Sequence, residues 1–338
     1  MEIENLFEEE EETNEILSDT LNQTNDTDET TPDLPKPFGM GLGVGSATID
    51  GKILHQFAAY ADTQRAALPL SVDMVQQWAA LAPSGSEIAI ARRLSIARSF
   101  SKYLHFTHPQ SPIIPAKLIG RTHRRLPPFI YSHSAVNACL NAASALLPAY
   151  GIRSLTIRTL LGLLISSGLR PGEAVRLQKN DVDIEQATLT IMRSKNWHRR
   201  LVPIVPSTVD SLKHYLLVRE LFAPLTDSAS LFLMDNGEAL NIETADHAFT
   251  VIRQHADINY KINGRYPRLY DFRHTFVCRR IQVWYEKGLD VNSLIPSLSR
   301  YLGHKKITDT YWYVSATPQL MKLSASRFER YCEQGDEK

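Results

Sequence analysis

The sequence has 338 residues, 43% of them hydrophobic, so the chain is long enough to bury a core and to form about two domains. Its longest apolar run, LLGLLISSGL at 160–169, is well short of the roughly 18 residues that a membrane span requires. Cys139, Cys278 and Cys332 lie far apart in no metal-ligand spacing, which argues against a zinc site or a disulfide framework. With no signal peptide visible, we expect a soluble cytoplasmic protein without a metal or cofactor.

The charges are segregated along the chain, although Lys plus Arg and Asp plus Glu both total 37. Thirteen carboxylates lie within residues 1–35, before the first basic residue, Lys36, and this leaves 24 carboxylates against 37 basic residues in the rest of the chain. That excess of +13 suits a polyanionic partner, although an ordinary basic globule would show it too. Residues 1–48, acidic and then rich in Pro and Gly, are predicted to form a disordered tail.

The segment 49–110 is predicted to be a helical domain, because three helix-like patterns follow one another there. They are DGKILHQFAAYA, SVDMVQQWAAL with Ser71 as its N-cap, and SEIAIARRLSIARSFSKYLHF. The last of these combines a packing face of small residues with a basic flank that is either solvated or DNA-facing: Arg92, Arg93, Arg98 and Lys102. A proline-rich and basic linker is predicted over 111–128.

The second domain is predicted to span 129–338 and to be mixed α/β, mostly helical. Its helix SLTIRTLLGLLISSG is apolar on most sides and therefore buried, and Gly168 ends it. A β-hairpin is expected next, because TLTIM and RLVPI flank the polar SKNWHR. Further helices include LYDFRHTFVCRRIQVWYEKG and a last one over 318–333.

Four motifs occur in one order: GLRPGEAVRL, the hairpin RSKNWHRRLVPI, LYDFRHTF and YLGHKKITDTYWYV. They resemble the tyrosine recombinase (integrase) family, whose site has an Arg in a G-L-R-x-x-E turn, a hairpin Lys, a His-x-x-Arg, a Leu-Gly-His and a Tyr nine residues later. The resemblance implies a helical core-binding domain joined to a catalytic domain. Carried over position by position, the catalytic set becomes Arg170, Lys195, Arg273, His304 and Tyr313.

The chemistry of DNA transesterification explains this combination. A phosphodiester is an anion that repels nucleophiles, and a phenol with a pKa of about 10 needs help to attack it. Arg170 and Arg273 would grip the phosphate oxygens, and His304 would add a hydrogen bond. Lys195 would protonate the leaving 5′-hydroxyl, and Tyr313 would become linked to the 3′-phosphate. Taken singly, each residue also has an ordinary structural explanation: for Arg273, for example, an ion pair with a nearby carboxylate.

One position departs from the family pattern, because the residue three before Arg273 is Tyr270 and not His. The neighbouring His274 is expected to project on a different side of the helix, about 100° away, and so not to substitute. We expect Tyr270 to hold the phosphate or the nucleophile by a hydrogen bond, the alternative being a core aromatic that only packs. The proton of Tyr313 is then expected to pass to water, to Lys195 or to a phosphate oxygen.

Two tyrosines, Tyr311 and Tyr313, compete for the role of nucleophile, with packing of both as the default explanation. On a helix they point about 200° apart, so at most one of them can face the phosphate site. The family spacing from His304 selects Tyr313, which leaves Tyr311 and Trp312 to pack or to line the DNA.

The sequence therefore predicts a site-specific DNA recombinase that integrates or excises a mobile element. The resemblance implies double-stranded DNA as partner, a nucleoid-associated location, and a homotetramer on paired sites, with the helix 318–333 docking on a neighbour through Leu320, Leu323 and Phe328. Two alternatives stay open. One is a chromosome-dimer resolvase or topoisomerase-like enzyme with the same chemistry, and the other is a non-catalytic DNA-binding regulator.

Overall fold

The fold was analysed in a computed structural model of the chain. Its described residues are 44–66, 68–120, 127–148, 150–192, 199–222, 228–262, 264–314, 320–322 and 325. By their contacts, these residues fall into two compact units, one up to residue 120 and one from residue 127 on. Most of the predicted acidic tail lies outside the described residues, but helix α3 (Val44–Thr63) begins inside the predicted 1–48 segment.

The first unit is helical and consists of α3, α4 (Val72–Ala80), α5 (Glu87–Thr107) and the short 3-10 turn η1 (Ala116–Leu118). The predicted N-cap is present, since Ser71 Oγ accepts a hydrogen bond from the Met74 N–H at 3.4 Å. Phe57 and Trp78 meet edge to face in the core, with 4.9 Å between ring centroids.

The prediction of a basic flank is wrong for one residue, because Arg93 is buried. Its Nη1 donates to the Trp78 carbonyl at 2.9 Å, and its guanidinium lies 4.8 Å from the centre of the Trp78 ring. This position faces inward because α5 packs against α4. The methylene chain of an arginine is apolar and can be buried when its guanidinium is hydrogen-bonded. Arg92, whose side chain is about half exposed, lies 3.5 Å from Asp50.

The second unit is built around α7 (Arg153–Ser167), which is buried on most sides as its sequence predicts and packs against α6 (His133–Ser144), α9 (Pro206–Phe222) and α11 (Tyr270–Glu286). Gly168 ends it in the left-handed conformation at φ +61, and any side chain at Gly168 would collide with the Phe276 ring. The carbonyl of this glycine points toward the site described below. The turn continues into α8 (Pro171–Ala174) and the 3-10 turn η2 (Lys179–Asp181).

The predicted hairpin belongs to an antiparallel sheet that, in the described part of the chain, has three strands in the order β1 (Val182–Asp183), β2 (Thr188–Met192) and β3 (Arg199–Pro203). Leu189 pairs with Val202 and Ile191 with Arg200. Leu189, Ile191 and Val202 are buried, so this face of the sheet packs on the core. The tip of the hairpin, 193–198, lies outside the described residues.

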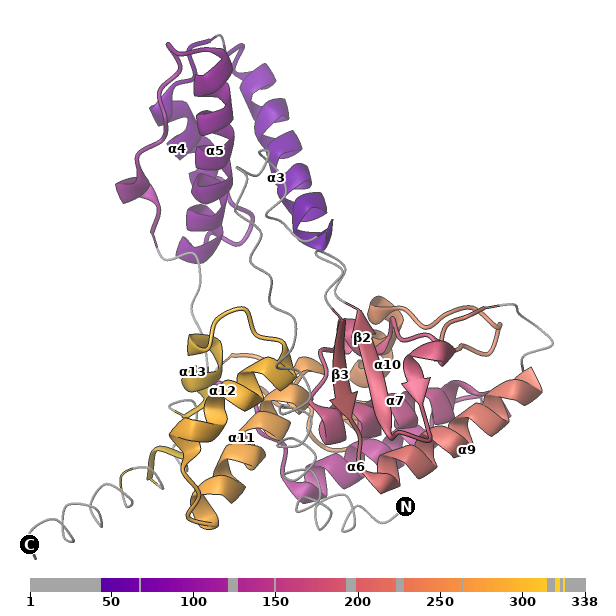
Figure 1. The fold of residues 1–338 in the computed structure, drawn as a ribbon. Helices are drawn as coiled ribbons and strands as arrows, with labels where there is room; N and C mark the ends of the chain where they lie inside the picture. Colours follow the sequence, from indigo (N-terminus) through magenta and orange to yellow (C-terminus); the bar gives the residue numbers. More distant parts are fainter. Residues whose placement is uncertain are drawn as a thin grey trace, which may run out of the picture. The chain divides into compact units, whose positions relative to one another are not determined.

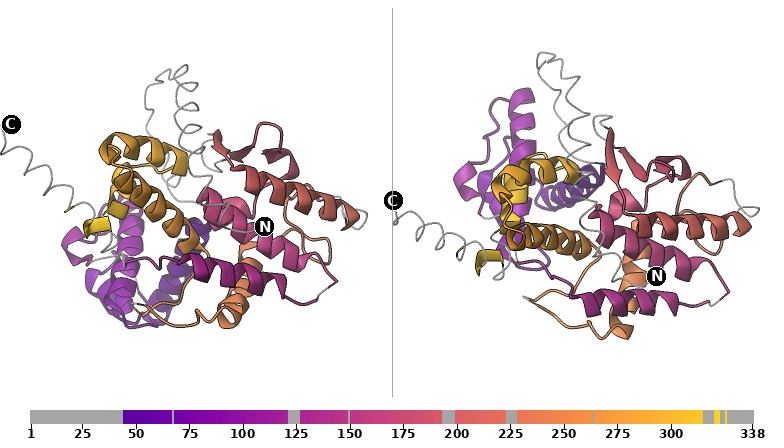
Figure 2. Two further views of the ribbon diagram at one scale, coloured as in Figure 1. Left: turned by 90° about the horizontal axis from the view of Figure 1, so that it is seen from below. Right: turned by 60° about the horizontal axis from the view of Figure 1, so that its bottom comes forward.

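The second unit continues with α10 (Ile242–His255), α11, α12 (Val291–Leu302) and α13 (Thr308–Val314). Figures 1 and 2 show α11 to α13 on one side of this unit and the sheet with α9 on the other. Cys139 and Cys278 are buried free thiols. Within the described ranges, no helix has both the length and the apolarity to cross a bilayer.

The predicted C-terminal helix falls largely outside the described residues, which include 320–322 and 325 of it. Leu320 is buried in the core of its own unit. The expectation that Leu320 belongs to a face docked on a neighbouring copy is therefore wrong: the sequence shows that a helix has an apolar face but not whether its own chain covers that face.

Candidate active site

Arg170 is held at the turn that follows α7. Its Nη1 donates to Glu173 Oε1 at 2.8 Å, its backbone N–H donates to Glu173 Oε2 at 3.2 Å, and its Nη2 donates to the Gly303 carbonyl at 3.3 Å. Burial opposes the charge of Arg170, but the carboxylate of Glu173 and the oxygen of Tyr270 outweigh burial and raise the pKa of Arg170. This guanidinium is oriented by a carboxylate and remains one-third exposed.

Glu173 binds a second arginine, which the sequence analysis did not identify. Arg200 on β3 donates from Nη2 to Glu173 Oε2 at 2.7 Å and from Nη1 to Glu173 Oε1 at 3.2 Å, and its Nε donates to the Tyr301 carbonyl at 3.1 Å. Burial alone would raise the pKa of Glu173, but Arg200 and Arg170 outweigh it and lower that pKa to about 2. The Glu of the G-L-R-x-x-E turn was the available signal that a cationic partner was required.

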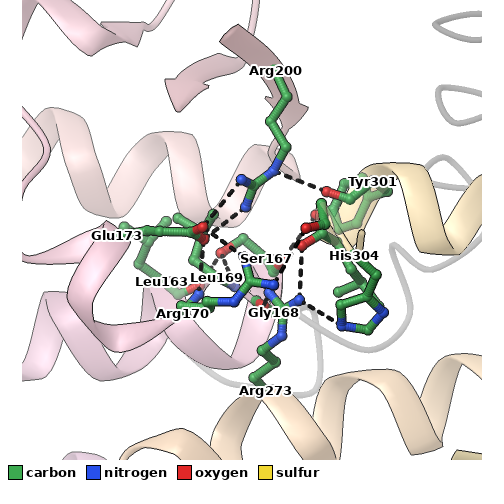
Figure 3. Close-up of polar contacts among 12 residues, drawn as sticks. Leu163, Ser167, Gly168, Leu169, Arg170, Glu173, Arg200, Arg273, Tyr301 and His304 are labelled. Atoms are coloured by element: carbon green, nitrogen blue, oxygen red, sulfur yellow. Dashed lines mark hydrogen bonds and ion pairs between the residues drawn. The ribbon is translucent and has the colours of Figure 1, made fainter. Parts of the chain in front are cut away.

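Arg273 is fully buried and joins three segments of the chain (Figure 3). Nη1 donates to the Gly168 carbonyl at 2.8 Å, and Nη2 donates to the Leu302 carbonyl at 2.8 Å and to His304 Nε2 at 3.0 Å. In the described part of the chain its partners are therefore two backbone carbonyls, an imidazole and the Tyr313 phenol, and not an ion-pair carboxylate. Burial lowers the pKa of Arg273.

His304 lies at the end of α12 with both ring nitrogens in use. Because Nε2 faces the Arg273 N–H, it must accept, and Nδ1 is left to donate to Thr310 Oγ1 at 2.7 Å. Burial, and then the charges of Arg273 and Arg170, lower the pKa of His304 to about 4. At neutral pH His304 is therefore an uncharged imidazole fixed in one tautomer.

The two tyrosines of α13 have different surroundings. Tyr313 is 3% exposed and faces α11, whereas Tyr311 is 39% exposed. The Tyr313 Oη lies 2.9 Å from Nδ1 of His274, and burial raises the pKa of Tyr313 well above its ordinary value. Of the two phenols, Tyr313 is therefore the one that lies with the arginines and histidines.

The contact with His274 corrects one expectation. The sequence predicts that His274 lies on the wrong side of the helix to serve the site, yet its Nδ1 contacts Tyr313 and its ring lies edge to face with Trp312, 5.7 Å away. A helical wheel orders the side chains around α11, but it does not show where α13 packs. Here α13 lies beside His274.

Tyr270 is half-buried at the start of α11. Its ring meets His274 edge to face at 5.0 Å between centroids, and it lines a cleft with Arg170 and three further arginines: Arg176, Arg253 and Arg268. Tyr270 thus lies at the wall of a basic cleft and next to the site. Lys195 is in the hairpin tip, outside the described residues.

The arrangement suits an anion in contact with a nucleophile. The guanidinium groups of Arg170 and Arg273 come from the first and the third of the four sequence motifs, and neutral His304 and phenolic Tyr313 lie beside them. Such groups stabilise the charge that develops on a phosphoryl oxygen during attack. In the described ranges no three His, Cys, Asp or Glu side chains gather as they would to hold a metal ion.

Comparisons with known proteins point to one family. Residues 132–319 match the phage integrase family. The putative integrase/recombinase y4rB of Sinorhizobium fredii is 34% identical over 268 residues, which cover 78% of this chain and 85% of the relative.

Solved structures share the fold at low identity. The XerH site-specific recombinase bound to palindromic difH substrate superposes with a TM-score of 0.64 at 18% identity, over 85% of this chain and 81% of that one. A lambda integrase tetramer bound to a Holliday junction gives a TM-score of 0.57 at 14% identity, over 81% and 73% of the two chains.

Proposed function

The chain belongs to the phage integrase family of tyrosine recombinases, and from this premise we propose that it cuts and rejoins double-stranded DNA at specific sites through a 3′-phosphotyrosyl intermediate. The observation that carries the proposal is the packing of Tyr313, a buried phenol, beside the cluster of Arg273 and His304. A phenol buried for packing alone would need no cationic neighbours.

The phosphate-binding groups act on the charge of the scissile phosphodiester. Arg170 is one-third exposed and can bind a non-bridging oxygen of the phosphate. Arg273 is fully buried and would neutralise the negative charge of the phosphate from within the site. Arg273 has donors left for a phosphate oxygen, because its Nη1 makes one hydrogen bond, to the Gly168 carbonyl, and its buried Nε has no partner among the described residues. His304 acts through Arg273, which it holds by its Nε2, and it adds no charge, because burial lowers the pKa of its imidazole to about 4.

The reaction conserves the phosphodiester. The Tyr313 oxygen forms a bond to phosphorus, the bond from phosphorus to the 5′-oxygen breaks, and the leaving 5′-oxygen takes a proton, for which we propose Lys195 as the donor. A 5′-hydroxyl from another strand then attacks the phosphotyrosine, and Tyr313 leaves. Cleavage and resealing are therefore one transesterification run in two directions, without metal or ATP.

We assign the biological role as integration or excision of a mobile element. The relative y4rB, to which the chain is similar over most of its length, is named a putative integrase/recombinase. Resolution of chromosome dimers is the second candidate, because it uses the same chemistry. Four copies would act on two paired sites, a number that fits the tetramer in which lambda integrase is bound to a Holliday junction, and residues 49–110 would contribute to binding the duplex.

The test is covalent trapping on nicked duplexes prepared from the DNA that flanks the gene. A nick next to the scissile phosphate lets the 5′-hydroxyl fragment diffuse away, so the protein should remain linked to DNA, in EDTA and without ATP. Sequencing of the trapped DNA would locate the site, and flanking repeats there would distinguish an element from a chromosomal resolution site. No adduct on any fragment of the flanking DNA would overturn the proposal.

A further inference from the structure

The proton of the nucleophile has a defined acceptor in this chain. On the proposed function as premise, we propose that His274 is the general base of DNA cleavage and takes the hydroxyl proton of Tyr313 as its oxygen attacks phosphorus. The Nδ1 of His274 lies 2.9 Å from the Tyr313 Oη, within the range of a hydrogen bond that transfers a proton. The side chain of His274 is 12% exposed, so little water competes for this contact.

Two other groups of the site that could act as bases, His304 and Asp271, are already occupied. His304 uses Nε2 with Arg273 and Nδ1 with Thr310, so neither nitrogen is directed at the phenol. Asp271 accepts from Arg268, through the backbone N–H at 2.9 Å and the guanidinium at 3.1 Å. His274 is thus the group whose basic atom faces the reacting oxygen.

The position that the family pattern gives to a histidine is filled here by Tyr270, whose phenol is a poor base at neutral pH. Its ring lies 5.0 Å from that of His274, centroid to centroid. The imidazole four residues further along α11 is on the same side of the helix as Tyr270. An imidazole is therefore retained next to the nucleophile, one helical turn away from the expected place.

The charges around His274 make its basicity depend on DNA. The charged and titratable groups that face it come from α11, from the loop before it, from α13 and from the end of α12: Asp271, Tyr270, Arg273, Arg265, Arg268, Tyr313 and His304. In the free protein, burial first and then the arginines lower the pKa of His274 to about 3. A phosphate bound by Arg268 or Arg273 offsets these positive charges and raises the pKa of His274 toward its ordinary range. His274 is then a weak base without DNA and a competent one with it.

The proton balance closes within the site. Tyr313 loses its proton to Nδ1 of His274 while its oxygen bonds to phosphorus, and the imidazole becomes an imidazolium. The 5′-oxygen leaves with a proton from the acid, for which Lys195 is the proposed donor. In the reverse step the incoming 5′-hydroxyl returns its proton to that acid, and His274 protonates Tyr313 as it leaves.

The decisive variant is His274→Asn, because an Asn side chain places a hydrogen-bond acceptor near the position of Nδ1 but cannot accept a proton. In single-turnover cleavage of a nicked duplex, His274→Asn and His274→Ala should both be about 100-fold slower than wild type. His255→Asn, at an exposed position of α10 whose Nδ1 contacts the Val251 carbonyl, is the matched control and should cleave at the wild-type rate. Wild-type cleavage by His274→Asn would overturn the proposal, as would a defect confined to His274→Ala, since it would indicate positioning only.

The leaving group separates the base from the acid. A duplex with sulfur in place of the bridging 5′-oxygen needs no proton donor, because a thiolate is a good leaving group. This substrate should restore cleavage to Lys195→Ala but not to His274→Asn. Rescue of His274→Asn would assign His274 to the leaving group and contradict the proposal. Equal melting temperatures and DNA affinities of the variants would exclude loss of folding.

A measurement without DNA keeps this inference separate from the proposed function. In nitrogen NMR of the labelled imidazoles, His274 should be the neutral tautomer that carries its proton on Nε2, with Nδ1 as acceptor, and Tyr313→Phe should shift the Nδ1 resonance. A proton on Nδ1 would overturn the inference even if wild type forms the DNA adduct. If wild type forms no adduct at all, the proposed function fails, whatever the tautomer.

Discussion

The two halves of the site are held in different ways. The proposed phosphate-binding half, or cradle, consists of Arg170, Arg200 and Arg273, which are fixed by the Glu173 carboxylate and by backbone carbonyls at 2.7 to 3.3 Å. The nucleophile half holds the Tyr313 hydroxyl against His274, a neutral imidazole, with the Arg273 guanidinium also acting on it. In the cradle, the Glu173 carboxylate holds Arg170 and Arg200 by charge-assisted bonds, which are roughly twice as strong as neutral ones. The difference indicates that the cradle is fixed before DNA binds.

The largest effect is expected from removing the nucleophilic oxygen. Tyr313→Phe should form no covalent adduct on a nicked duplex, because no other group replaces the phenolic oxygen as the bond to phosphorus. Its DNA affinity should stay close to that of wild type, since the cradle is untouched. Denaturing gel electrophoresis of the adduct and a binding titration measure the two quantities on the same sample.

Tyr311→Phe is the matched control, because it deletes the same phenolic oxygen from a tyrosine two residues before Tyr313. The side chain of Tyr311 is 39% exposed. It should cleave as wild type does. If peptide sequencing located the adduct on Tyr311, the assignment of Tyr313 as the nucleophile would be reversed.

The next effect concerns the anchor of the cradle. Glu173→Gln removes the negative charge between Arg170 and Arg200 and leaves two partly buried cations to repel each other, so the free energy of unfolding should fall by about 3 kcal/mol. Cleavage should slow as well, because Arg170 loses its orientation. Thermal or urea unfolding of the second unit gives the first quantity and single-turnover cleavage the second.

Asp210→Asn provides the comparison with an exposed ion pair. Asp210 lies 4.0 Å from Lys213 and its side chain is 78% exposed, so the substitution should change stability by less than about 0.5 kcal/mol. Equal effects of Glu173→Gln and Asp210→Asn would show that the cradle is not held by Glu173.

The sequence predicts the backbone of the site better than its side-chain contacts. Gly168, the turn after it and the hairpin follow from local patterns of periodicity and turn chemistry, and the structure has them where expected. Arg93, His274 and Leu320 differ from expectation because their surroundings depend on which helices pack against them. Helix packing is set by the whole core, and a local pattern does not contain it.

As the pH is lowered, the free energy of unfolding should fall first because of the two buried histidines and only later because of Glu173. His274 and His304 have pKa values of about 3 and 4 in the folded protein against an ordinary 6.5, so the unfolded chain binds more protons below pH 6.5. Stability should therefore be constant with respect to these groups above pH 6.5 and fall as pH drops toward 4, by up to about 1.4 kcal/mol per pH unit for each histidine. The contribution of Glu173 is present above pH 4.5 and is lost as pH falls through about 2.

Urea unfolding between pH 7 and pH 4 measures this slope. His274→Asn should remove close to half of the histidine contribution, whereas His255→Asn should leave the slope unchanged. A wild-type curve that stays flat from pH 6.5 to pH 4 would mean that His274 and His304 are not held neutral by the fold.

The smallest effect is expected at Tyr270, which borders both halves. Its oxygen supports Arg170 in the phosphate half, and its ring contacts His274 in the nucleophile half. Tyr270→Phe keeps the ring and deletes one hydrogen bond, so cleavage should slow about fivefold, equivalent to about 1 kcal/mol, with DNA affinity almost unchanged. Tyr260→Phe, at a phenol that is 49% exposed, is the control.

Tyr270→His tests whether an imidazole at position 270 can take the role that we propose for His274. An imidazole at this position restores the family pattern, so the variant should remain active. In the double variant Tyr270→His with His274→Asn, the new imidazole should recover part of the cleavage lost in His274→Asn, because it lies on the same side of α11 as the one removed. Wild-type cleavage by Tyr270→Phe, together with a lower melting temperature of Tyr270→His, would instead assign Tyr270 to packing. The border residue would then belong to neither half, and the cradle would be complete without it.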